Sequence, residues 1–188
     1  MKITLLSGSI VGSKTTAALL VTRQYLQEQF PNEDIQLIDL ADYTIQFSDG
    51  RNYLEYEGDT GYVAAELMNS DVIVIGTPIF QASLPGSLKN IFDLLPQQAF
   101  LGKVVGILAT AGSSRHYLVP EQQLKPILSY MKAQIVQTYV YIEEKDFRQK
   151  EIINDDILFR LRRLADDLKA TTEAFQAIQA EKEAEYGF

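Results

Sequence analysis

The chain has 188 residues, 46% of them hydrophobic, and it carries a formal net charge of -8. This length and composition favour one domain with a full apolar core, and the acidic balance argues against broad nucleic-acid binding, which needs a basic surface. Cysteine is absent and histidine occurs once, which excludes disulfides, thiolate catalysis and metal sites built from cysteines or several histidines.

The N-terminal segment, MKITLLSGS, contains only a short apolar run. It is too short for a signal peptide and has no cleavage-site pattern. No later stretch approaches the roughly 20 apolar residues of a membrane span. We therefore expect a cytoplasmic protein that does not associate with membranes.

Short β-branched runs alternate with helical patterns along the chain, which is typical of a parallel sheet wrapped in helices. The segment VIVIG is apolar throughout, as expected for a central strand covered on both faces. Pro85 indicates a helix start, because proline is favoured at the first helical position. In chain order we expect strands at Lys2–Leu6, Ile35–Leu40, Val72–Gly76, Val104–Ala109 and Ile135–Ile142, and helices at Thr15–Phe30, at Val63–Asn69, from Pro85, over Leu124–Met131 and from about Asp155 onward.

Five strands with interleaved helices predict a doubly wound α/β sheet of order 2-1-3-4-5, in a single domain over residues 1–188 with a long C-terminal helix. Ligands of such folds bind outside the carboxyl ends of the strands, at the point where the strand order reverses. The loops after the first, third and fourth strands should converge there. These loops, 7–14, 77–84 and 110–116, are rich in Gly, Ser, Thr and Pro.

The first loop, SGSIVGSKTT over residues 7–16, joins a strand to a helix N-terminus. Free backbone N–H groups and the helix dipole bind anions at such a place, and hydroxyls and the Lys14 ammonium add donors, which predicts a phosphate monoester site. An ordinary capped turn has a similar composition. A nucleoside triphosphate loop is disfavoured, because Ser13 stands where that motif needs its second glycine and the third strand ends without a metal-binding Asp.

The segment from Thr77 to Asn90 resembles the T-P-x-Y-x-x-S-x-x-G-x-L-K-N motif of the NADPH-dependent FMN reductase family, with Phe80 in place of the usual Tyr. The match continues through DLLP at 93–96, GKVV at 102–105 and ATAG at 109–112, and it covers roughly residues 1–145. Residues 95–141 are most similar to the reductases that supply reduced FMN to alkanesulfonate monooxygenases.

The resemblance implies a flavodoxin-like three-layer sandwich that binds FMN and NADPH or NADH, and hydride transfer between them without a catalytic side chain. Reduced FMN would serve a partner monooxygenase or a small acceptor such as a quinone or azo compound. Carried over residue by residue, the phosphate would contact Ser9, Ser13, Lys14, Thr15 and Thr16; the flavin ring would lie on Pro78, Ile79, Phe80 and Gln81, with Ser83 nearby; and its polar edge would face Thr110, Ala111, Gly112 and Ser113.

The family also implies a homodimer or homotetramer. The apolar stripe of the last helix would pack either on the domain's own sheet and helices or between subunits; it comprises Ile157, Leu161, Leu164 and Leu168.

Several alternatives stay open on the sequence alone. In the sulfonate subgroup an aromatic insertion often stands where this chain has Gln122, so FMN is either a passing substrate or a resident prosthetic group. A flavodoxin-like electron carrier without nicotinamide turnover is the main alternative, although the Gly86-x-Leu88-Lys89-Asn90 helix start is that of the reductases. His116 either touches the nicotinamide or the flavin edge or is a surface or capping residue. Arg115 either pairs with the extra phosphate of a nicotinamide cofactor, as Lys14 could, or is a solvated surface charge.

Overall fold

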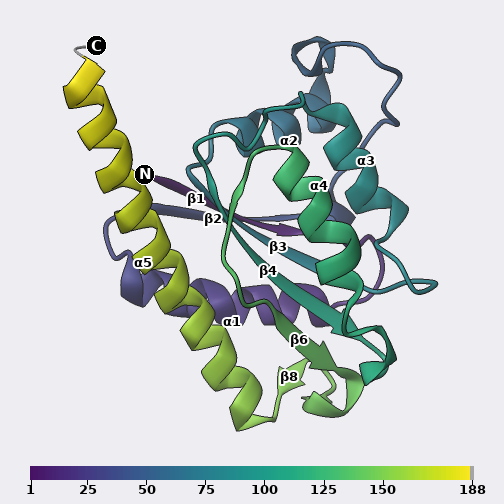
Figure 1. The fold of residues 1–188 in the computed structure, drawn as a ribbon. Coiled ribbons are helices and arrows are strands. Elements are labelled where there is room, and N and C mark those ends of the chain that lie inside the picture. Colours follow the sequence, from purple (N-terminus) through teal and green to yellow (C-terminus); the bar gives the residue numbers. More distant parts are fainter. Residues whose placement is uncertain (187–188) are drawn as a thin grey trace.

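The computed structural model describes residues 1–186 and is built around one parallel sheet between two helical layers (Figure 1). The main strands are β1 (Lys2–Ser7), β2 (Asp34–Asp39), β3 (Val72–Pro78), β4 (Val104–Ala111), β5 (Gln134–Ile135) and β6 (Val140–Glu143). The helices that cover them are α1 (Lys14–Gln29), α2 (Gly58–Met68), α3 (Gly86–Leu94), α4 (Lys125–Tyr130) and α5 (Asp155–Tyr186).

Shorter elements fill the connections. A hairpin of β7 (Phe147–Arg148) and β8 (Glu151–Ile152) precedes α5, and a π-helical segment, η4 (Pro120–Leu124), leads into α4. Single 3₁₀ turns are η1 (Leu40–Asp42), η2 (Tyr53–Glu55), η3 (Ser114–His116) and η5 (Glu144–Asp146). Within the residues described, no helix is both long and apolar enough to cross a bilayer.

The strand order is β2-β1-β3-β4-β5, all parallel, which confirms the predicted order 2-1-3-4-5. The side chains of β3 alternate between two apolar cores. Val72 and Val74 pack in the core under α1 and α5, whereas Ile73 and Ile75 pack in the core under α2, α3 and α4. A central strand buried on both faces therefore has a continuous apolar sequence.

The fifth strand differs from the prediction, because 135–142 is not one continuous strand. Its two ends pair with β4 as β5 and β6, and four residues, 136–139, span only two residues of β4. This extra length bulges from the sheet and is held by Lys125, whose Nζ donates to the Gln137 carbonyl at 2.8 Å. The bulge contains the polar pair Gln137 and Thr138, with β-branched and aromatic residues on both sides. A bulge adds residues to a strand without ending it, so the pattern predicted one continuous strand.

Two helix starts also differ from expectation. The helix α2 begins at Gly58, five residues before the predicted Val63, and Pro85 is the N-cap of α3 rather than its first residue. The start of α5 at Asp155 is as predicted.

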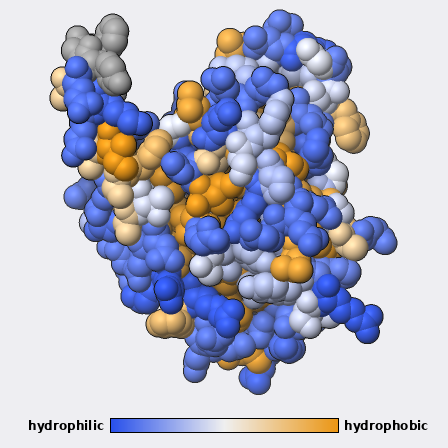
Figure 2. All heavy atoms as spheres, in the orientation of Figure 1, coloured by the Kyte–Doolittle hydropathy of each residue, from blue (hydrophilic) through white to orange (hydrophobic). Residues whose placement is uncertain are grey.

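The apolar stripe of α5 packs within its own chain. Its four side chains are buried in the core shared with α1, which excludes the stripe as a subunit interface. The last turns of α5 extend past the sheet (Figure 1), and Figure 2 shows that most of this face of the molecule is hydrophilic.

Candidate functional site

The register of the sheet brings three loops to one edge. Ser7 pairs with Gly76 and Pro78 pairs with Thr110, so β1, β3 and β4 end at nearly the same level. A cavity of about 340 Å³ opens between the loops that follow, and the segment after β6 closes its remaining side. It is lined by Val11, Gly12, Ser13, Lys14, Thr15, Pro78, Ile79, Phe80, Thr110, Ala111, Gly112, Glu144 and Phe147.

One end of the cavity is the N-terminus of α1. Gly12 has a φ of +82°, a left-handed conformation that glycine adopts readily, and it turns the chain into the helix. Ser13 is the N-cap residue, yet its side chain makes no capping hydrogen bond. The first N–H groups of the helix are thus left without a side-chain acceptor, and the positive end of the helix dipole faces a solvent-accessible space. This arrangement suits an anion.

The hydroxyl groups near this helix start divide into two sets. The Thr15 hydroxyl lies 2.7 Å from the Thr110 hydroxyl in a buried contact that joins the first loop to the end of β4. Thr16 instead donates to Asp39 at 2.6 Å, and Ser9 bonds to the backbone of Val11. Ser9 and Thr16 therefore shape the loop and do not line the cavity.

A tight turn after β3 forms a second wall. The backbone groups of Phe80 and Ser83 are paired in both directions, at 3.0 and 2.9 Å, around Gln81 and Ala82. Both central residues have positive φ, 47° and 60°, as in a type I′ turn. Such conformations cost about 1 kcal/mol or more for residues other than glycine. Phe80 lines the cavity and is 41% exposed.

This turn is held from two sides. The Ile79 N–H donates to the Thr110 carbonyl at 2.9 Å, which ties it to β4. The Ser83 hydroxyl donates to the Gln123 side chain at 2.6 Å, which ties it to the π-helical segment η4. Gln81 and Ser83 thus support the wall from outside the cavity.

The end of β4 forms the third wall, where the side chains are small. A Cβ atom placed on Gly112 would meet no protein atom within 4 Å, so the main chain there is open to a flat ligand. The following loop is anchored by Tyr141, whose hydroxyl donates to the Ser113 carbonyl at 2.6 Å. Burial raises the pKa of this tyrosine. Ser113, Arg115 and His116 lie outside the cavity lining.

The fourth side of the cavity comes from residues that sequence reasoning missed. Glu143 pairs with Ala111, so Glu144 leaves the sheet at the same edge as Gly112. The Glu144 carboxylate forms an ion pair with Lys14, whose Nζ also lies 5.6 Å from the centre of the Phe147 ring. The position after the fifth strand could have suggested this segment, because every parallel strand delivers its following residues to this edge.

The predicted site residues therefore fall into two groups. Those that converge on the cavity are Ser13, Lys14, Thr15, Pro78, Ile79, Phe80, Thr110, Ala111 and Gly112. Those that surround it without lining it are Ser9, Thr16, Gln81, Ser83 and Ser113. An uncapped helix N-terminus beside an open glycine and an exposed ring fits a ligand that has a phosphate at one end and a flat ring system at the other.

Comparisons with known proteins agree with this chemistry. The chain is 42% identical over 168 residues to an NAD(P)H-dependent FAD/FMN reductase of Geobacillus thermodenitrificans, covering 88% of this chain and 90% of that one. It is 26% identical over 171 residues to the NADH-dependent FMN reductase SfnF of Pseudomonas putida, covering 90% and 92%. The apo structure of the NADH:FMN oxidoreductase EmoB has the same fold, with a TM-score of 0.73, 24% identity and coverage of 90% and 89%. The model of the NADPH-dependent FMN reductase family matches residues 1–147, and the chain belongs to this family.

Proposed function

We propose that the cavity between the three loops is the place where this NAD(P)H-dependent FMN reductase binds FMN and brings it against the nicotinamide. The observation that carries the proposal is the meeting of the uncapped N-terminus of α1 with the open backbone at Gly112 in one cavity of about 340 Å³. Small-molecule sites have volumes of this order.

The phosphate would be bound at the start of α1. The donors at this end of the cavity are the backbone N–H groups that follow Ser13, the Ser13 hydroxyl and the Lys14 ammonium, which is paired with Glu144. Hydrogen bonds to a charged group contribute about 1.5–3 kcal/mol each. The phosphate would thus provide the anchor that distinguishes FMN from riboflavin.

The walls at Phe80 and Gly112 would orient the ring. Bound FMN supplies the two-electron chemistry, so the chain's own task is to fix the ring, keep one of its faces accessible and place polar backbone at its edge. The turn at Gln81 and Ala82 is suited to this task because Gln123 and the Thr110 carbonyl restrain it from both sides. Preorganised backbone dipoles at the end of β4 would stabilise negative charge on the reduced ring.

The recipient of the reduced flavin would be a partner monooxygenase or a small acceptor such as a quinone or azo compound. The resemblance of residues 95–141 to reductases that serve alkanesulfonate monooxygenases supports the first. The open cavity supports either, because the ring must be reachable after nicotinamide departs.

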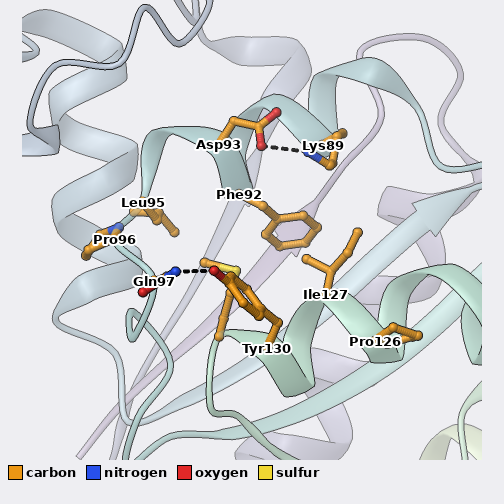
Figure 3. Close-up of a pocket in the computed structure, with 10 residues that line it drawn as sticks. Lys89, Phe92, Asp93, Leu95, Pro96, Gln97, Pro126, Ile127 and Tyr130 are labelled. Atoms are coloured by element: carbon orange, nitrogen blue, oxygen red, sulfur yellow. Dashed lines mark hydrogen bonds and ion pairs between the residues drawn. The ribbon is translucent and has the colours of Figure 1, made fainter.

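A homo-oligomer would use the apolar groove between α3 and α4. Figure 3 shows Phe92 of α3 beside Ile127 and Tyr130 of α4, in a groove of about 500 Å³. Tyr130 is 61% exposed, and the α5 stripe is already occupied within the chain. A second copy on this groove would bury these rings. Light scattering at micromolar concentration should give at least a dimer and Tyr130→Glu should give a monomer; a wild-type monomer would contradict the assembly.

The reductase activity is tested by mixing the purified protein with FMN and each nicotinamide cofactor, and following absorbance in the nicotinamide band. We expect turnover with NADPH, NADH or both that depends on added FMN. Absence of turnover with both cofactors, in protein shown to bind FMN, would refute the function.

A further inference from the structure

An acidic side chain stands beside the proposed phosphate site. Glu144 lines the cavity and forms an ion pair with Lys14. Among the described residues that line the cavity, Lys14 is the one with a cationic side chain. The two residues lie 130 positions apart in the sequence, so the contact is made by the fold and is not a local pairing. An anion that binds Lys14 must therefore first displace the Glu144 carboxylate.

The segment that carries Glu144 is fixed in place by the carboxylate of Asp146. Asp146 is almost fully buried, at 4% exposure, and its carboxylate accepts from the Glu143 N–H at 2.8 Å and from the Asn154 side chain at 2.7 Å. The Asp146 carbonyl accepts from the Ile153 N–H at 2.9 Å. These bonds join the two ends of the β7–β8 hairpin, so the backbone at Glu144 is held at the cavity edge.

The electrostatics of this pair oppose phosphate binding. Lys14 is the first residue of α1, where a cation is disfavoured by the helix dipole and an anion is favoured. The Glu144 carboxylate already satisfies the ammonium there. A phosphate monoester carries about -1.5 to -2 charges at neutral pH, so its arrival would meet like-charge repulsion and would have to displace the carboxylate from Lys14.

We propose that Glu144 acts as a built-in competitor of the FMN phosphate, which weakens FMN binding and keeps the flavin exchangeable. This inference rests on the proposed FMN site. FMN would then be a substrate that dissociates in its reduced form and not a resident prosthetic group. The reason is that a carboxylate that binds Lys14 again favours release of the phosphate. Most affinity differences among variants of one site appear in the dissociation rate.

Glu144→Gln tests the proposal, with FMN and riboflavin dissociation constants measured by flavin fluorescence quenching. We expect FMN to bind about fivefold more tightly, the upper end for an exposed charge pair, and to dissociate correspondingly more slowly in stopped flow. Riboflavin lacks the phosphate and should bind unchanged. Glu151→Gln is the matched control, because it removes the same charge from the hairpin that follows Glu144, at an exposed position outside the cavity.

Three outcomes would overturn the proposal: FMN affinity that changes by less than about twofold, equal tightening of FMN and riboflavin, or equal tightening of FMN by Glu151→Gln. The first outcome would mean that Glu144 does not compete with the phosphate. The second would mean that Glu144 affects binding of the flavin ring, and the third that only the net charge of the protein matters. The assay measures binding alone, so the result for Glu144 is independent of catalysis. Failure of hydride transfer in a separate turnover experiment would refute the proposed function but would not change the measured effect of Glu144 on FMN binding.

Discussion

Replacing Gly112 by valine would place a branched side chain where the proposed flavin site is open. A Cβ atom on Gly112 meets no protein atom within 4 Å, so the branch point of the new side chain has room in the apo protein. Its thermal stability should change little, because the loop position requires no left-handed backbone. Any large effect would therefore fall on the ligand.

The magnitude follows from the cost of overfilling a packed site. Extra methyl groups forced into such a site cost about 1–3 kcal/mol, which corresponds to roughly fivefold to more than a hundredfold weaker binding. The assay is FMN titration by fluorescence quenching, together with turnover under NADPH and a thermal melt to monitor folding.

Gly86→Val is the matched control for this substitution. A Cβ atom added to Gly86 would also meet no protein atom within 4 Å, but this glycine starts α3 and does not line the cavity. We expect the control to retain FMN affinity and the Gly112 variant to lose it. Unchanged FMN affinity and turnover in Gly112→Val, with the same melting temperature, would refute the placement of the ring at the end of β4.

Three further predictions concern the loops around the cavity. Ser13→Ala should weaken FMN about tenfold and leave riboflavin nearly unchanged, and equal weakening of both ligands would count against the phosphate assignment. Gln123→Ala removes the acceptor of the Ser83 hydroxyl and should raise the KM for FMN more than it lowers the melting temperature; an unchanged KM would show that the turn needs no such support. Burial raises the pKa of Tyr139 above its ordinary value of 10.0, so this side chain stays protonated in the native state while unfolded chains begin to ionise. The free energy of unfolding should therefore fall as the pH rises above about 10, and less steeply in Tyr139→Phe; an equally steep fall would contradict the assignment.

The strand order and the convergence of three loops were predictable from sequence because they depend on simple regularities. Apolar runs such as Val72–Gly76 identify central strands, and parallel strands deliver their following loops to one edge. The motif around Phe80 then indicated the ligand class. Asn90 of this motif has a structural role, because its side chain forms hydrogen bonds with the backbone of Gln46 and Ser48 and fixes the loop after β2.

Other features depend on contacts that no local pattern encodes. The bulge in the fifth strand rests on Lys125 reaching the Gln137 carbonyl from α4. Ser9 and Thr16 look like phosphate donors in sequence, yet their hydroxyls are used by neighbouring groups of the fold. Glu144 enters the cavity because Asp146 holds the hairpin ends together, an arrangement that sequence spacing does not predict.

The central claim is that the protein transfers hydride from a nicotinamide cofactor to FMN held between these loops. Anaerobic stopped flow tests it most directly, because bleaching of the oxidised flavin band reports reduction without any acceptor. We expect rapid bleaching of FMN after mixing with NADPH or NADH, and slower bleaching in Gly112→Val. If the wild-type protein binds FMN and neither cofactor bleaches it within minutes, the protein is an electron carrier and not a reductase.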